Sequence, residues 1–132
     1  GLHAYEILSR EPWMDEGPAR FAVPVSHQDQ VIAAPPHAAT IAGSSFCAHA
    51  ALVYRDQPAV SFQGHPEFEP AYAAALVESR RGTRFSPTLA DEAVASLTGA
   101  NDRERVGGWI ARFIESAAPA RARQAPCLET SV

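Results

Sequence analysis

The sequence lacks the features that mark several large classes of protein. Only two cysteines occur, Cys47 and Cys127, and they lie far apart, so we expect no disulfide framework and a reducing cytoplasm as the compartment. No stretch approaches the roughly 18 apolar residues that a membrane helix needs. The first residues contain neither the basic nor the apolar segment of a signal peptide. We therefore expect a cytoplasmic protein without a membrane partner.

Positive charge is also scarce. Lys and Arg together number 11 against 15 Asp and Glu, and the formal net charge is -4 at pH 7. Apart from "SRRGTR" in the middle and "RAR" near the end, the basic residues are spread thinly. Because a nucleic-acid-binding surface needs a concentrated basic patch, we expect no nucleic-acid partner.

The composition is typical of one globular unit. The 132 residues are 46% hydrophobic and 20% charged, which is enough apolar material for a single core. The chain begins with Gly1 rather than Met, and the residues directly after it already have the pattern of a strand. We expect the N-terminal part of a larger protein to precede this sequence.

The first half of the chain has the apolar runs and turn residues of β-structure. We predict strands at residues 3–8, 20–25, 30–36, 39–45, 48–54 and 59–63. The last two flank "RDQP", whose residues favour a hairpin turn. The nearly continuous apolar stretch "PAVSF" predicts that 59–63 is a buried strand of a central, largely parallel sheet.

The second half of the chain has helical periodicity. Pro70 suits the first turn of a helix that ends at Gly82. Ser86 and Pro87 begin a second helix, which runs to about Leu97. These two helices should pack on or beside the sheet.

A third helix is predicted after Asn101. With Glu104 three residues later, Asn101 resembles a capping box. The apolar residues that follow recur at spacings of three, four and seven, at Val106, Trp109, Ile110, Phe113 and Ile114. Strands followed by helices indicate the closing part of an α/β domain, with residues 118–132 as a flexible tail.

The segment "GHPEF" places His65 and Glu67 two residues apart at the predicted end of a strand. Pro66 between them favours extended backbone for His65, so that both side chains point to the same side. A carboxylate beside an imidazole can fix the tautomer of the ring and stabilise its charged form, as in a catalytic triad. A surface histidine beside a solvated glutamate is the alternative, and the pair alone does not decide between them.

Three segments in this order, "VPVSHQDQV", "SSFCAHAA" and "SFQGHPEF", resemble the C-terminal half of a class I glutamine amidotransferase domain. The nearest resemblance is to the stand-alone subgroup similar to the amidotransferase domain of GMP synthase. The segment "ERVGGWIARFI" looks like the closing helix of that family, so the resemblance covers residues 1–117. It implies a three-layer α/β fold with a largely parallel, flavodoxin-like sheet, of which this chain would be an incomplete C-terminal portion.

The resemblance also implies a reaction and its residues. The family removes ammonia from the side-chain amide of glutamine through a cysteine thioester. His65 would then be the catalytic acid and base, Glu67 would orient it, and Ser26, His27 and Gln28 would line the glutamine pocket. No cofactor is implied, and the acceptor of the ammonia would belong to a synthase domain or partner.

The nucleophile of the family lies in a G-x-C-x-G turn between a strand and a helix, and neither cysteine here has that context. Cys47, in "SSFCAHA", has no flanking glycines, and we interpret it as a structural residue. The nucleophile would come from a missing N-terminal segment or from another chain. Two alternatives stay open: a γ-glutamyl peptide hydrolase with the same triad, and a catalytically silent fragment or interaction module.

Two further groups of residues have simpler interpretations. Cys47, His49, His27 and His37 match no common zinc-binding spacing, so we predict no metal site. His27, followed by Asp29, is equally consistent with a histidine held in a turn. The arginines of "SRRGTR" are interpreted as a solvated helix end that suits the helix dipole.

Overall fold

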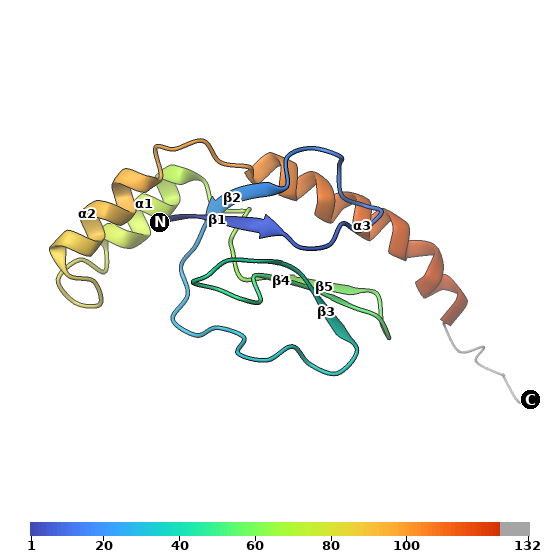
Figure 1. Cartoon of the computed structure of the whole chain (residues 1–132). Helices are drawn as coiled ribbons and strands as arrows, with labels where there is room; N and C mark the ends of the chain where they lie inside the picture. Colours follow the sequence, from blue (N-terminus) through green and yellow to red (C-terminus); the bar gives the residue numbers. More distant parts are fainter. Residues whose placement is uncertain (125–132) are drawn as a thin grey trace, which may run out of the picture.

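The structure is a computed structural model that describes residues 1–124, and the side chains of residues 1–118. In these residues five strands precede three helices, and Figure 1 shows their arrangement. The strands are β1 (Leu2–Ile7), β2 (Arg20–Pro24), β3 (Ala38–Gly43), β4 (Ala51–Tyr54) and β5 (Ala59–Phe62). The helices are α1 (Pro70–Glu78), α2 (Pro87–Ser96) and α3 (Arg103–Gln124).

The strands form one sheet in the order β2-β1-β3-β4-β5, and each neighbouring pair is antiparallel. The prediction of a largely parallel sheet is therefore wrong for the described residues. Parallel neighbours need a long crossover connection, usually a helix. Here the helices all follow the last strand, and short connections join β3 to β4 and β4 to β5, so the α/β class is right but the strand directions are not.

β5 lies at an edge of the sheet with only β4 beside it, and each of its residues is partly exposed. Val60 and Phe62 pack against the core from one face of the strand. The prediction of a buried central strand at 59–63 is therefore wrong. So short an apolar run does not distinguish a strand buried on one face from a strand buried on both.

The two edge strands approach each other where they end, so the sheet is curled. Just after β5, the N–H of His65 donates a hydrogen bond of 2.7 Å to the carbonyl of Pro24, the last residue of β2. Gly64 lies against Val23, and a Cβ atom at Gly64 would collide with the Val23 side chain. β2, β3 and β5 run in the same direction, so their carboxyl ends lie along one border of the sheet. This border is called the carboxyl edge, to distinguish it from the outer strands β2 and β5.

Residues 25–37 connect β2 to β3 as a loop, so the strand predicted at 30–36 is absent. Pro35 and Pro36 have no N–H to donate to a strand partner, and Ile32 is 94% exposed. The other five predicted strands each overlap an observed strand, with shifted boundaries.

α1 and α2 begin at the two prolines that predicted them, Pro70 and Pro87. Ser86 caps α2, since its Oγ accepts a hydrogen bond of 3.2 Å from the N–H of Leu89. Gly82, with φ of 72°, lies in the turn between the helices, where a residue with a side chain would be strained. The two helices pack on each other at one end of the molecule (Figure 1), and the expected three-layer arrangement is not seen in the described residues.

The start of α3 is tied to β2 rather than closed by the expected capping box at Asn101. Asp102 N–H donates to the carbonyl of Ala22 at 2.7 Å, and the Asp102 carboxylate accepts from Ala22 N–H at 2.8 Å. Asn101 instead accepts a long hydrogen bond of 3.4 Å from the N–H of Arg103. The helix therefore begins at a fixed point on the edge of the sheet.

The core lies between the sheet and α3. Trp109 and Val106 of α3 are fully buried, and the Trp109 ring meets Phe21 of β2 edge to face, with 5.3 Å between ring centroids. α3 runs to Gln124, into the segment expected to be a tail, and residues 125–132 of that segment lie outside the described residues. Of the helices that the structure describes, none is long and apolar enough to cross a membrane.

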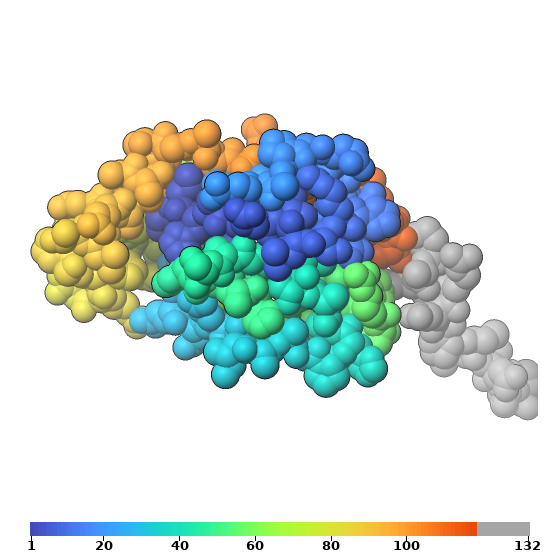
Figure 2. Space-filling model, in the orientation of Figure 1, coloured from blue at the N-terminus to red at the C-terminus, as the bar shows by residue number. Residues whose placement is uncertain are grey.

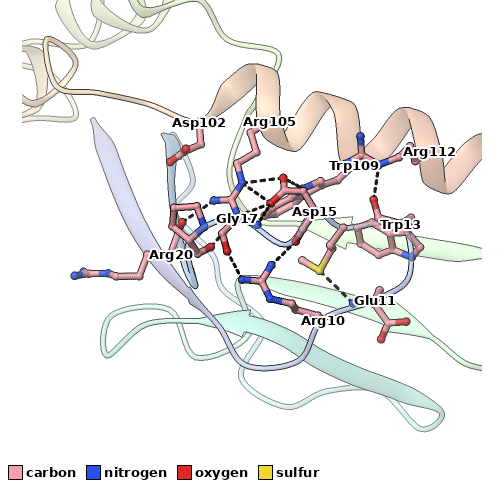
Figure 3. Close-up of polar contacts among 12 residues, drawn as sticks. Arg10, Glu11, Trp13, Asp15, Gly17, Arg20, Asp102, Arg105, Trp109 and Arg112 are labelled. Atoms are coloured by element: carbon pink, nitrogen blue, oxygen red, sulfur yellow. Dashed lines mark hydrogen bonds and ion pairs between the residues drawn. The ribbon is translucent and has the colours of Figure 1, made fainter.

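Asp15 fastens the connection between β1 and β2 to α3 (Figure 3). Its carboxylate accepts hydrogen bonds from Arg105 at 2.8 to 3.1 Å, from the Trp109 indole at 2.7 Å and from the N–H of Gly17 at 2.7 Å. The hydrogen bonds from Arg105 hold the pKa of Asp15 far below its usual range, although partial burial opposes the shift. The β1–β2 connection is long and has no regular secondary structure, and this cluster holds it in place.

Candidate active site

His65 and Glu67 form the hydrogen-bonded pair that the sequence predicts. The Nδ1 atom of His65 lies 2.7 Å from a carboxylate oxygen of Glu67. Pro66 lies between them and limits the backbone freedom of the segment. The segment is a turn rather than the predicted extended backbone, since Pro66 and Glu67 lie at the centre of a turn, so the pair is right but the predicted reason for it is wrong. When Nδ1 donates to the carboxylate, Nε2 carries the lone pair, which is the tautomer that a general base needs.

The imidazole of His65 is also held through its face. The Phe68 ring is stacked on it, with 4.2 Å between centroids and 9° between planes. Tyr72, in the first turn of α1, contacts Phe68 edge to face at 4.8 Å. The N–H of Phe68 donates a hydrogen bond of 3.0 Å to the carbonyl of His65, so a turn of the backbone sets up the stack. Phe68 was not among the predicted site residues, and its spacing of three from His65 is the signal that could have indicated it.

The pair with His65 changes the acidity of Glu67. Partial burial by itself raises the pKa of the Glu67 carboxyl, whereas the hydrogen bond with His65, a backbone hydrogen bond and the charge of His65 lower it. The net pKa lies below the usual value. Glu67 is 63% exposed in its side chain, so water screens this interaction. Glu67 is therefore ionised at neutral pH and able to orient the ring.

The two segments predicted to form the site meet in space. His65 follows β5 and is bonded through its backbone to Pro24 at the end of β2. Ser26, His27 and Gln28 begin two residues after Pro24, in the loop that leaves the same edge of the sheet. The prediction that the pair lies where strands end is consistent with this arrangement, because the carboxyl ends of β2 and β5 adjoin there.

A cavity of about 580 Å³ lies beside this edge. It is lined by the start of β1, residues 25–29, Phe46 after β3 and one side of the α1–α2 pair. Figure 2 shows the light-blue loop after β2 meeting the yellow turn between α1 and α2. Ser26, His27 and Gln28 line the cavity, but neither His65 nor Glu67 does. The structure therefore does not place the His65–Glu67 pair and the predicted substrate residues in one concavity.

Two arginines that were predicted to form a solvated helix end contact the predicted substrate loop instead. Arg80 donates a hydrogen bond of 3.2 Å to Ser26 Oγ, and Arg84 donates one of 3.0 Å to the side-chain oxygen of Gln28. Both arginines line the cavity. No local pattern predicts this contact, because it depends on the turn after α1 meeting a loop more than fifty residues earlier in the chain.

His27 is held in its loop. Its Nδ1 lies 3.1 Å from the backbone carbonyl of Asp29, rather than from the Asp29 carboxylate. Its Nε2 is buried and has no hydrogen-bond partner among the described residues. His27 is thus held in a turn, as one interpretation of the sequence had it, and it also lines the cavity.

Cys47 lies in the core and is fully buried. Burial raises the pKa of its thiol, although a backbone hydrogen bond partly opposes the shift. A neutral, inaccessible thiol is a poor nucleophile, which fits the structural role predicted for Cys47. The neighbouring His49 is hydrogen-bonded to Thr40 at 2.7 Å, and no group of metal-ligating side chains is found in the described residues. The prediction that the protein needs no metal stays a prediction.

The comparisons with known proteins give the class of fold. No family model matches the sequence, and no curated protein does. Among solved structures, the chain resembles one with a TM-score of 0.63 over 87% of this chain, at 21% identity. That protein is a glutamine amidotransferase from Thermotoga maritima. The described chain spans 50% of its length and shares the fold of that part.

Proposed function

We propose that this chain is the C-terminal part of a class I glutamine amidotransferase, in which His65 and Glu67 are two members of a Cys-His-Glu triad. The observation that carries the proposal is the 2.7 Å hydrogen bond between His65 and Glu67, at the carboxyl ends of β2 and β5. A fold shared with part of a glutamine amidotransferase supports it. The remaining half of the domain would supply the parallel strands and the nucleophilic cysteine, and the protein would act in the cytoplasm.

The chemistry that His65 performs follows from its tautomer. With Nδ1–H donated to Glu67, Nε2 is the basic atom and takes the proton of the attacking cysteine thiol. The imidazolium then gives a proton to the departing ammonia, and the ring later accepts a proton from the water that hydrolyses the thioester. Glu67 stabilises the charged ring in each step, because its carboxylate stays ionised.

Ser26, His27 and Gln28 would position the glutamine. The three residues line a cavity of about 580 Å³, a volume typical of small-molecule sites. His65 does not line this cavity, so the amide end of the substrate would extend past Pro24 towards the ring. The GMP synthase-like subgroup and a synthase partner that accepts the ammonia belong to this proposal as well.

A γ-glutamyl peptide hydrolase is the second candidate, since the same pair would serve the cleavage of a γ-glutamyl amide. A catalytically silent module is the third. The sequence encoded directly before Gly1 discriminates the last from the first two. A G-x-C-x-G turn after an apolar strand supports an enzyme, and its absence supports the silent module.

The proposal predicts that ammonia release from glutamine needs both halves. The chain of residues 1–132 alone is expected to be inactive, because its described cysteine is buried and protonated. The chain extended by its upstream segment is expected to be active. His65→Ala in the extended chain should reduce turnover by about 10²-fold or more, as for a lost general acid and base. Ammonia release is measured for the three proteins side by side.

Two outcomes would contradict the proposal. Turnover by the chain alone would identify another nucleophile. An extended chain with a cysteine turn whose activity is indifferent to His65→Ala would leave the fold in place and remove the mechanism. Replacing glutamine by a γ-glutamyl dipeptide in the same assay distinguishes the two enzyme candidates.

A further inference from the structure

The cavity beside the carboxyl edge of the sheet has the composition of a ligand site. Apolar walls come from β1, α1, α2 and the turn between the two helices, through Leu2, Val77, Leu89 and Phe85. Small-molecule sites usually combine such walls with a few convergent polar groups that set the orientation of the ligand. Here two of the polar groups are guanidinium groups, and both come from the turn between α1 and α2.

The three arginines of that turn differ in their partners. Arg81 is neutralised by two carboxylates, with hydrogen bonds of 2.7 Å to Glu78 and an ion pair of 2.9 Å to Asp91. Arg80 and Arg84 have no ion pair with any described carboxylate, and their hydrogen bonds go to neutral oxygens of the loop after β2. Two guanidinium groups therefore line a cavity with their charges uncompensated by described side chains.

Other polar groups of the cavity complete the arrangement. Glu92 of α2 and Asp29 of the loop also line the cavity. A wall with two guanidinium groups and two carboxylates suits a zwitterion with one carboxylate and one ammonium group. A phosphate dianion would be repelled by Glu92 and Asp29.

We propose that Arg80 and Arg84 bind the α-carboxylate of the substrate amino acid, with the α-ammonium group directed to the acidic side of the cavity. The inference rests on the proposed function and names a specificity-determining pair for it. Glutamine and a γ-glutamyl residue carry the same α-carboxylate, so the pair would serve either substrate. Arg contacts to carboxylates are strong because they are charge-assisted and can be bidentate.

The position of the cavity agrees with this assignment. Val25 and Ser26 line it and directly follow Pro24, whose carbonyl holds the backbone of His65. A substrate with its α-carboxylate at the arginines can therefore extend its side chain towards His65 along the end of β2. In this orientation the α-carboxylate and α-ammonium groups, which glutamine and a γ-glutamyl residue share, lie in the cavity. The reacting amide lies outside it.

The test is a titration of the 132-residue chain followed by NMR, with the His3 and His27 ring resonances as probes because both rings line the cavity. The probes are glutamine, a γ-glutamyl dipeptide and glutamine α-amide, which lacks the carboxylate. The first two should shift the resonances, and the α-amide should bind about tenfold or more weakly, as expected for a lost hydrogen bond to a charged group. Inorganic phosphate should bind more weakly than glutamine.

Variants assign the effect to the two arginines. Arg80→Gln with Arg84→Gln should reduce glutamine affinity by about tenfold or more. Arg81→Gln is the matched control, since it removes the same charge from the same turn but its side chain is occupied by Glu78 and Asp91. It should leave the affinity unchanged. No shift with glutamine, equal binding of the α-amide, or equal loss in the control would overturn the inference.

The extended chain separates this inference from the proposed function. If it hydrolyses glutamine with a KM that the double variant leaves unchanged, the function stands and the arginine assignment is wrong. If glutamine binds through the arginines but the extended chain never releases ammonia, the site stands and the reaction is wrong.

Discussion

The ring of His65 is fixed by residues that follow it closely in the chain. Glu67 holds its edge, Phe68 covers its face, and Tyr72 supports Phe68 from the start of α1. A group that transfers protons must keep its orientation through the reaction. Each of these contacts therefore helps the reaction by restricting the motion of the imidazole. The stack makes Phe68 a positioning residue under the proposed function.

We expect Phe68→Leu in the extended chain to lower kcat for glutamine by about two- to tenfold with little change in KM, because an aromatic pair contributes about 0.5–1.5 kcal/mol beyond its area. Phe68→Tyr keeps the ring and should restore the rate. In the 132-residue chain alone, NMR relaxation should show a more mobile His65 ring in Phe68→Leu than in the parent, and an unchanged ring in Phe68→Tyr. Equal rates for the three proteins would show that the stack has no part in positioning.

Residue chemistry in this protein was predictable where it depended on local sequence. The spacing of His65, Pro66 and Glu67 predicted a paired imidazole and carboxylate, but on the assumption of extended backbone. The structure forms the pair in a turn instead, with Pro66 and Glu67 at its centre. The contacts of Arg80 and Arg84 were not predictable, because their partners come from a loop that only the fold brings near. A cluster of arginines at the end of a helix has the same local pattern whether it faces water or a cavity.

At the scale of elements, the helix starts were predictable and the strand directions were not. Pro70 and Pro87 begin α1 and α2 because proline fits the first turn and lacks a hydrogen-bond donor. The direction of β5 depends on its partner β4, and the apolar pattern of a strand carries no information about its partner. The helix–strand order resembled a parallel α/β sheet, but no helix lies between two of the described strands.

The connection between β1 and β2 is an element whose order depends on charge. Asp15 accepts from Arg105, Trp109 and Gly17, and its side chain is about one third exposed. We expect Asp15→Asn to lower the free energy of unfolding by about 1–2 kcal/mol, since hydrogen bonds to charged groups are worth about 1.5–3 kcal/mol and solvent screens part of this. Urea unfolding followed by tryptophan fluorescence measures it.

Glu6→Gln is the control for that variant. Glu6 and Arg20 form an ion pair of 3.4 Å that is well exposed on both sides. Its loss should cost about 0.5 kcal/mol or less. If both variants were destabilised equally, the Asp15 cluster would be no more than another surface ion pair.

The same cluster predicts how stability responds to acid. The pKa of Asp15 is lower in the folded chain than in the unfolded chain, where it is about 3.9. Its contribution is therefore complete well above that value and is lost as pH falls towards the folded pKa, so stability should decline below about pH 5. Asp15→Asn should show a shallower decline than the parent in unfolding free energy measured from pH 7 to pH 3. Parallel declines would contradict the assignment.

At the scale of the whole molecule, the curl of the sheet is what creates the site. β2 and β5 are the two edges of the sheet, yet their ends are joined through His65 and Pro24. This closure brings the segment with His65 next to the loop with Ser26, although the two edges would be far apart in a flat sheet of the same order. The contact between His65 and Pro24 is thus the point at which the curled sheet brings the two parts of the candidate site together.

Gly64 makes the closure possible, because its lack of a side chain lets the chain pass against Val23 and the Tyr5 ring. We expect Gly64→Ala to destabilise the chain by about 1–3 kcal/mol, as for overpacking of a core, and to move the His65 resonances as the two edges separate. Gly107→Ala is the matched control: Gly107 lies in α3 with open space around its Cα, so alanine there should be neutral or stabilising by up to about 1 kcal/mol. Thermal unfolding and the NMR spectrum of His65 measure both effects. A Gly64→Ala chain as stable as its parent, with unchanged His65 resonances, would show that the β2 and β5 ends do not need this close approach and that the curl does not position the site.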